Sequence, residues 1–458
     1  RHFTAQGIPV LTLDSLPGLH KENLTGTRME SIVPYHSRML GAALQAARNP
    51  HLELVQIVSF GCGHDAIISD EVQRLLHQES DKELLILKLD EGENAGPLGV
   101  RIKSLIETVK TRRASHGYLY EFRDIKLRLQ DAYQAKFQKG DKKKRTILIP
   151  NLSPGFSRLI TRVIDRSGYR TVEVPIADAR AIEIGKKYVH NDMCFPAQVN
   201  LGELIKELQD GNYDQATTAV ALAKNCEECR AGQYSVVGRK ALDDAGWSGI
   251  PIVTTGIDTK NMHPGFKLYK TFQLRMLYGI VMLDHLEYMV RRIRPYEVQA
   301  GDADRVYDMY LDLITRDVPS SRRKAIAHFD KAIEAFNHIP INDEPRRPVV
   351  GIVGEILLNF HPASNCYLEK YLEDNGMETQ LPTLIDFFRR RTIADKIKGE
   401  REWSPFPLAS RLLHGMRDRV YGHASDLMHR KMEKFKFYQG YSNTYSLIRN
   451  VEDIVDAT

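Results

Sequence analysis

The stretch LELVQIVSF, at Leu52–Phe60, decides how the first third of the chain is interpreted. This short apolar, β-branched run stops at Gly61, which is typical of a buried strand in a parallel sheet. Residues 65–77 follow with apolar side chains at helical spacing, and a second short apolar run lies at 84–89. Residues 100–109 again have a helical pattern. Strand and helix in alternation predict βαβ units and a parallel sheet.

The same pattern begins twice more along the chain. The segment TILIP at 146–150 opens one series of predicted strands and helices, and PVVGIVG at 348–354 opens another. We therefore predict an α/β fold with two or three domains, which have parallel sheets flanked by helices, plus long helical segments. The predicted domains are residues 1–140, residues 141–345 with long C-terminal helices, and residues 346–458, the start of a further α/β unit that we expect to continue past Thr458.

Three longer stretches, at 118–138, 266–294 and 302–337, also predict helices. In the second of them aromatic and Met side chains fall at helical intervals, which favours packing. The strongest charge run, DKKKR at 141–145, lacks the second basic stripe and the interleaved aromatic residues that a nucleic-acid interface needs. We interpret this run as a solvated linker before a new domain.

Composition excludes several classes of protein. The chain has 458 residues, is 42% hydrophobic and 27% charged, and carries a net charge of +5, an ordinary globular balance. Its apolar runs fall short of the roughly 18 residues that span a bilayer. Phosphate-loop, dinucleotide, HExxH and GxSxG motifs are absent from the sequence, so it contains no ATPase motif. Five cysteines are too few for a disulfide scaffold, and their odd number fits a reducing cytoplasm.

The cysteines are the most informative residues, because four of the five lie at predicted ends of strands and helices, where open α/β sheets place ligand sites. Cys62 lies in the turn FGCGHD, Cys194 precedes Phe-Pro at the start of a helix, and Cys226 and Cys229 form CEEC. A buried structural cysteine is the ordinary interpretation of each one alone, and a single CxxC is weak evidence for zinc. Recurrence at three junctions instead favours thiolate ligation of an iron–sulfur cluster.

These segments resemble motifs of a known family. FGCGHD, KYVHNDMCFP and CEECRAGQY are similar to the three cysteine motifs of the 2-hydroxyacyl-CoA dehydratase superfamily and, more narrowly, of the acyl-CoA dehydratase activase-related proteins. Further matches are LKLDE at 87–91, GEI at 354–356 and Ser-Asn at 364–365. The order and approximate spacing of the motifs agree from about Gly7 to Asn375.

The chain departs from the family pattern at two of the cysteine motifs. His64 stands where relatives have proline, and Glu227-Glu228 stands where they have Gly-Pro before the third cysteine. Two carboxylates beside a negatively charged cluster would make its reduction harder.

The resemblance implies an oxygen-sensitive iron–sulfur cluster, 4Fe-4S or double-cubane, in an interdomain crevice. Such a cluster supports low-potential electron transfer or reductive chemistry. Matched motif by motif, the expected ligands are Cys62, Cys194 and Cys229. Cys226 is either a spare ligand or a bystander. Arg230 either hydrogen-bonds a cluster sulfide or a CoA phosphate, or lies at the surface at a helix start.

The resemblance also implies partners. These are an ATP-dependent activase module, in the same or another chain, and an acyl-CoA-type or other small reducible substrate; a homodimer is an arrangement that it allows. We expect no nucleic-acid and no membrane partner. The alternative function is a metal-free scaffold or interaction region of a larger activase-related polypeptide. Cys366, inside a predicted helix at 364–375, is interpreted as structural, and Glu355 as a helix cap with an acid–base role as the alternative.

Overall fold

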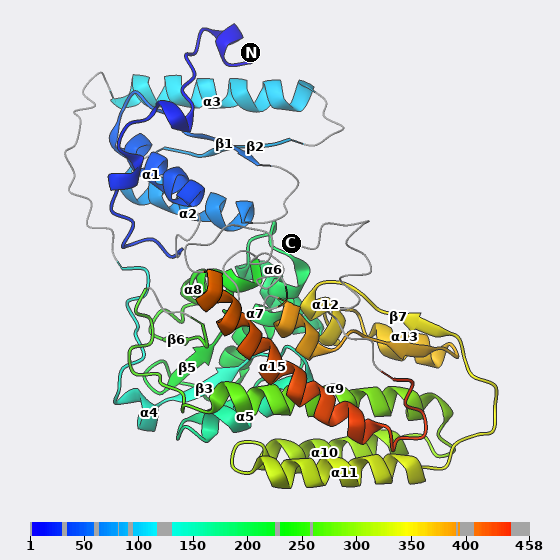
Figure 1. The fold of residues 1–458 in the computed structure, drawn as a ribbon. Coiled ribbons are helices and arrows are strands. Elements are labelled where there is room, and N and C mark those ends of the chain that lie inside the picture. The colour runs from blue at the N-terminus through cyan, green and yellow to red at the C-terminus, as the bar shows by residue number, and fades with distance from the viewer. Residues whose placement is uncertain are drawn as a thin grey trace. The chain divides into compact units, whose positions relative to one another are not determined.

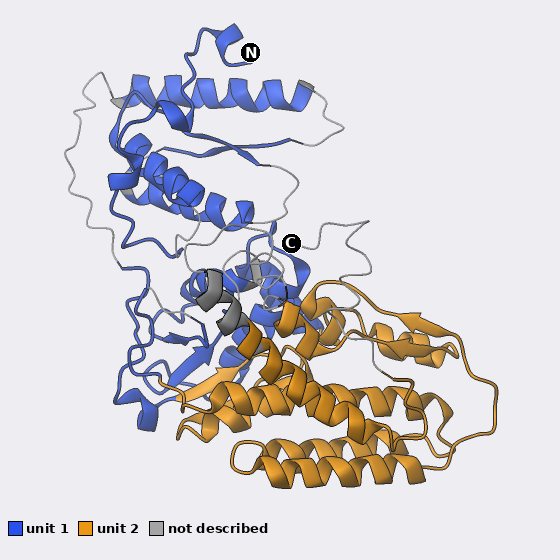
Figure 2. Cartoon of the chain, in the orientation of Figure 1, with its two compact units in different colours: residues 1–145, 179–266 blue, residues 146–178, 267–458 orange. Residues whose placement is uncertain are grey.

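The computed structural model describes residues 2–29, 34–58, 64–80, 82–89, 95–116, 131–224, 230–256, 260–390, 393 and 407–440. Within these ranges the chain has a mixed α/β fold with short parallel sheets flanked by helices (Figure 1). This is the fold class that the alternation of strand and helix patterns predicted. The chain forms two compact units (Figure 2): unit 1 comprises 1–145 and 179–266, and unit 2 comprises 146–178 and 267–458.

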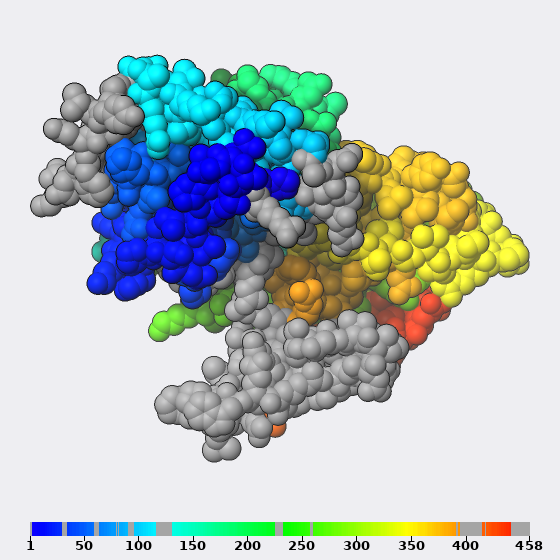
Figure 3. All heavy atoms as spheres, turned by 90° about the horizontal axis from the view of Figure 1, so that it is seen from above, coloured from blue at the N-terminus to red at the C-terminus, as the bar shows by residue number. Residues whose placement is uncertain are grey.

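The first α/β layer of unit 1 is built on two parallel strands. Its elements are η1 (Thr4–Gln6), η2 (Leu13–Ser15), η3 (Leu19–Lys21), α1 (Pro34–Arg48), β1 (Val55–Val58), α2 (Asp65–Glu79), β2 (Leu85–Lys88) and α3 (Ala95–His116). Val58 pairs with Lys88 in parallel register. Helices α1 and α2 cover one face of the strands and α3 covers the other (Figure 1). The first residues of the chain lie at the surface beside α3 (Figure 3). The strand predicted within Leu52–Phe60 and the helix at 65–77 are confirmed.

The remaining part of unit 1 holds two helices that approach each other very closely. Its elements are α4 (Asp141–Lys144), α6 (Ala179–Tyr188), α7 (Phe195–Asp210), β5 (Thr218–Ala221), η4 (Arg230–Gln233), α8 (Tyr234–Asp244) and β6 (Ile252–Val253). A Cβ atom on Gly185 of α6 would lie 1.9 Å from the carbonyl oxygen of Gln198, and one on Gly202 of α7 would lie 2.0 Å from that of Ala181. These two glycines therefore allow α6 and α7 to pack backbone against backbone.

The helix predicted at 118–138 is wrong for its described part, residues 131–138, which have no regular secondary structure. Tyr133 and Phe137 are almost completely buried there. The Tyr133 hydroxyl donates to the carbonyl oxygen of Arg28 at 3.0 Å, and the backbone N–H of Phe137 donates to that of Met262 at 3.0 Å. Burial of these rings through contacts with distant parts of the chain outweighs the local helical preference.

Unit 2 is organised around the long helix α9. Its elements are β3 (Thr146–Ile149), α5 (Pro154–Asp165), β4 (Arg170–Glu173), α9 (Phe272–Ile293), η5 (Arg294–Tyr296), α10 (Asp302–Asp317), α11 (Arg322–His338), β7 (Val349–Gly351), α12 (Ile356–Phe360), α13 (Leu368–Asp374), β8 (Glu378–Gln380) and α15 (Pro407–Met432). For comparison, the strand pairs within unit 1 are β1–β2 and β5–β6. Both β3–β4 and β7–β8 are parallel pairs.

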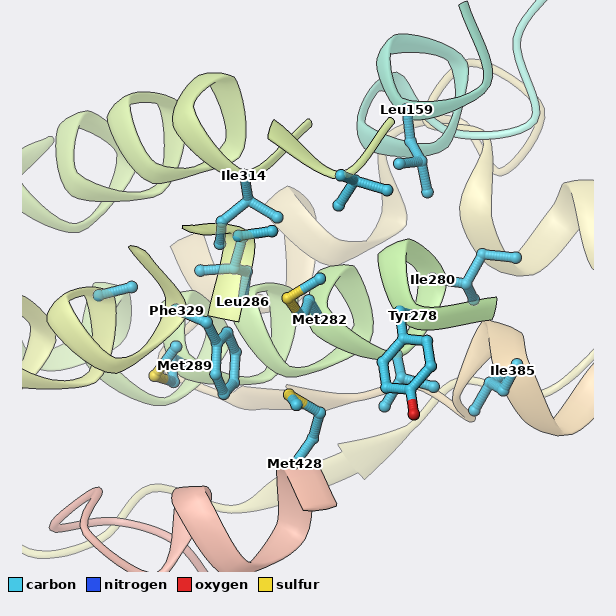
Figure 4. Packing of buried hydrophobic residues seen from close by; sticks show 14 of the residues in the cluster. Leu159, Tyr278, Ile280, Met282, Leu286, Met289, Ile314, Phe329, Ile385 and Met428 are labelled. Carbon is cyan, nitrogen blue, oxygen red and sulfur yellow. The ribbon is translucent and has the colours of Figure 1, made fainter. Parts of the chain in front are cut away.

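The core of unit 2 forms where four helices pack against α9 (Figure 4). Met282 and Leu286 of α9 lie in one buried cluster with side chains from the surrounding helices. These include Leu159 from α5, Ile314 from α10, Phe329 from α11 and Met428 from α15. The helical stretch predicted at 302–337 is present as two helices, α10 and α11, because the chain turns between Asp317 and Arg322.

Candidate functional site

The predicted site residues differ in how much the structure says about them. Cys62, Cys226 and Cys229 lie outside the described residues. Arg230 begins η4, and its side chain also lies outside the described part. The site is therefore built from Cys194 and from the described residues that flank the other cysteines.

Cys194 is the N-cap residue of α7. Its backbone is extended, with φ −59° and ψ 145°, and Pro196 lies in the first turn of the helix, as the sequence predicted. The Cys194 carbonyl oxygen accepts a hydrogen bond from the backbone N–H of Ala197 at 3.0 Å. The side chain makes no capping hydrogen bond and is partly exposed, and the thiol is not in a disulfide. The sulfur therefore lies at a positive helix N-terminus without serving as the cap.

Tyr234 connects the second cysteine motif to the third. It is the first residue of α8, five positions after Cys229, and only 2% of it is exposed. Its hydroxyl oxygen lies 3.8 Å from the Cys194 Sγ. Because the segment that follows CEEC packs against the Cys194 thiol, these two motifs meet in space.

A salt bridge connects the Cys194 turn to the strand next to β1. The Lys88 ammonium, at the end of β2, lies 2.5 Å from the Asp192 carboxylate, two residues before Cys194. Lys88 pairs with Val58, the last described residue before the FGCGHD turn. Adjacent strands lie about 4.8 Å apart, so the end of β1 that leads into that turn lies next to the Lys88 salt bridge.

A second contact joins α2, which follows the FGCGHD turn, to α8. The carboxylate of Asp70 in α2 lies 3.9 Å from the Lys240 ammonium of α8 and 3.1 Å from the Arg28 guanidinium. Burial raises the pKa of Asp70, while the charges of Lys240, Arg28 and His190 act to lower it. His190 belongs to the same turn as Asp192, so α2, α8 and the Cys194 turn come together.

We call this region the cysteine junction: the turn 190–194, the carboxyl ends of β1 and β2, the first two turns of α2, and α8. His64, immediately before α2, lies with its ring centre 5.0 Å from that of His36 in α1. Burial lowers the pKa of His36, His64 lowers it further, and Asp65 opposes the shift. The sequence singled out His64 and, within the LKLDE match, the segment that contains Lys88, but it gave no sign of His36 or Asp70.

Two residues assigned structural roles lie in unit 2. The Glu355 carboxylate accepts hydrogen bonds from the backbone N–H groups of Leu357 at 2.9 Å and Leu358 at 3.3 Å, so its predicted role as a helix cap is confirmed. Cys366 lies in the exposed turn before α13, with φ 57°, and not inside a helix as predicted.

The arrangement of potential metal ligands and the hydropathy of the helices bear on two of the predictions. Over the ranges that the structure describes, no group of three His, Cys, Asp or Glu side chains has an arrangement that could hold a metal ion. Three of the four predicted sulfur ligands lie outside those ranges. Among the described helices, none is long and apolar enough to cross a membrane.

No protein-family model, curated protein or solved structure matches this chain.

Proposed function

We propose that this chain is an iron–sulfur protein related to the 2-hydroxyacyl-CoA dehydratases and their activase-related proteins, with a cluster held by Cys62, Cys194 and Cys229 at the cysteine junction. The observation that carries the proposal is convergence. The Cys194 sulfur contacts Tyr234, which follows the Cys229 motif, and Asp192 is bonded to Lys88, beside the strand that leads to Cys62.

The described ligand candidate fits a cluster. The Cys194 thiol is partly exposed, is not needed to cap α7, and lies at the positive end of a 16-residue helix. Such a position favours the negative charge of a thiolate that binds iron. A cysteine sealed in an apolar core would not have these properties.

A bound cluster would supply low-potential electrons for a reductive step. The side chains around it would keep the three turns together: Lys88 with Asp192, and Lys240 with Asp70. Arg230 would donate to a cluster sulfide or to a phosphate of an acyl-CoA-type substrate. An ATP-dependent activase module would be the electron donor.

Iron and acid-labile sulfide in the anaerobically purified chain test this proposal. We expect about four of each per chain, or about eight iron atoms for a double-cubane cluster, and an EPR signal after reduction. Cys194→Ser should lose most of the iron. Cys366→Ser, the matched removal of the other described free thiol, should keep it.

The alternative, a metal-free scaffold, makes the opposite prediction. Wild-type chain without acid-labile sulfide, together with unchanged folding and association of Cys62→Ser and Cys194→Ser, would exclude the cluster and favour the scaffold.

A further inference from the structure

Unit 2 contains a cavity of about 280 Å³ that the cysteine chemistry does not use. It is half open and is lined by the end of α9 and η5, by β8, by the segment 341–346 that precedes β7, and by residues 436–439 after α15. These segments are far apart in sequence, so no local motif could have indicated the cavity. Its volume is close to the lower limit for small-molecule sites, roughly 300 Å³.

One wall of the cavity is a buried carboxylate surrounded by donors. Glu378 is 2% exposed and accepts hydrogen bonds from the Arg292 guanidinium, from the Tyr296 hydroxyl at 2.6 Å and from Arg346 Nε at 3.1 Å. Burial acts to raise the pKa of Glu378, but the hydrogen bonds from Arg346 and Tyr296 and the charge of Arg292 outweigh it and lower the pKa. Two guanidinium groups thus face one ionised carboxylate, which leaves a surplus of one positive charge.

Additional donors line the same cavity. Arg346 donates from Nε and Nη2 to the Glu378 carboxylate and from Nη2 to Gln439, while its Nη1 has no hydrogen-bond partner among the described residues. The Lys436 ammonium donates one hydrogen bond, to the carbonyl oxygen of Asn337 at 2.8 Å, and an ammonium has three hydrogens to donate. The second acidic side chain, Glu344, is already neutralised by Arg347 at 2.9 Å.

Flat apolar surfaces complete the lining. Tyr296, Phe437 and Tyr438 are among the residues that line the cavity, together with Ile341. The Tyr438 hydroxyl lies 2.7 Å from His429 Nδ1, which fixes the ring in place. Burial lowers the pKa of His429 to about 4, so this contact adds no positive charge at neutral pH.

We infer that this cavity binds a small organic anion, a carboxylate or phosphate monoester attached to a flat apolar body of about one ring. The anion would accept hydrogen bonds from Arg346 and Lys436, and the ring would lie against the aromatic side chains. A guanidinium forms charge-assisted hydrogen bonds with a carboxylate and with a phosphate in the same way, so the site has one binding chemistry for both anions.

Isothermal titration calorimetry on the full chain with phenyl phosphate and with benzoate tests this site. At least one of them should bind, while benzyl alcohol, which has the ring without the charge, should not. Arg346→Gln and Lys436→Gln should each weaken binding about tenfold, the effect of losing one charge-assisted hydrogen bond. Arg323→Gln, an exposed arginine on α11, removes the same charge from the surface of unit 2 and should leave binding unchanged.

Two results would overturn the inference: no heat of binding for either anion up to about 10 mM, or equal affinity for wild type and for both cavity variants. The Lys436 ammonium makes only an exposed hydrogen bond to a backbone carbonyl oxygen, so we expect Lys436→Gln to fold. The test therefore remains decisive even if Arg346→Gln fails to fold. Because the cavity shares no residue with the cysteine junction, loss of iron in Cys194→Ser has no bearing on this measurement.

Discussion

Helix α9 in unit 2 carries polar side chains into a closed core, whereas the cysteine junction in unit 1 holds its polar groups at partly exposed contacts. Both oxygens of Asp284 in α9 accept backbone N–H groups, from Leu384 at 2.7 Å and Ile385 at 2.9 Å. At the junction, the side chains of Lys88 and Asp192 are 49% and 27% exposed.

This difference separates a structural role from a binding role. A buried side chain whose two oxygens each accept a backbone N–H group is committed to the fold, so its loss would affect folding. The Cys194 thiol instead has one hydrogen-bond-range contact, at 3.8 Å, and is partly open to solvent. We therefore expect changes in α9 to alter stability and changes at the junction to alter ligand binding.

Acid should destabilise the α9 core by the largest amount. His285 Nδ1 lies 2.7 Å from the Val281 carbonyl oxygen, and its Nε2 lies 3.1 Å from His429. Burial and His429 lower the pKa of His285 to about 4 from 6.5, against the opposing effects of the Val281 bond and of Asp386. Below pH 6.5 the unfolded chain takes up a proton that the folded chain does not. The contribution of His285 to the free energy of unfolding is therefore fully present above pH 6.5 and is lost as the pH falls to 4. The loss is about 3 kcal/mol.

The measurement is urea unfolding at several pH values between 7 and 4. His285→Gln should flatten the dependence on pH, while His338→Gln, which removes an exposed histidine at the end of α11, should not. Equal pH slopes for wild type and His285→Gln would contradict the interpretation of this core.

The local parts of both regions could be predicted from the sequence, and the contacts between distant parts could not. The apolar runs that became β1 and β2 and the helical spacing of α2 are visible in short windows, because each is a property of neighbouring residues. The Cys194–Tyr234 contact joins residues 40 positions apart, and Lys88–Asp192 joins residues 104 apart. Only the fold brings these pairs together, so no periodicity reveals them.

The close packing of α6 and α7 gives a change of intermediate size. Gly202→Ala would place a Cβ 2.0 Å from the Ala181 carbonyl oxygen, so one helix must move. We expect a loss of about 1–3 kcal/mol in the free energy of unfolding. Since α7 begins directly after Cys194, iron content should fall as well.

Gly99→Ala is the matched control for this change. Its Cβ would meet nothing within 4 Å, and it lies inside α3. There the added methyl group should stabilise the helix by up to about 1 kcal/mol. Glycine to alanine is thus expected to lower the free energy of unfolding at position 202 and to raise it at position 99. The midpoints of urea unfolding measure both changes.

The smallest effect on stability should come from Lys88→Gln at the junction. Pairs this exposed contribute about 0–1 kcal/mol, so the urea midpoint should hardly move. The turn that carries Cys194 would nevertheless lose its salt bridge to β2, so the Cys194 thiol should react faster with iodoacetamide in iron-free protein.

Mass spectrometry of the Cys194 peptide, in a Cys366→Ser background, measures the rate of that reaction. Lys110→Gln breaks an equally simple surface pair within α3 and should leave the rate unchanged. If both variants reacted alike, the Lys88–Asp192 pair would have no role in holding the Cys194 turn, and the junction would depend on the Tyr234 contact instead.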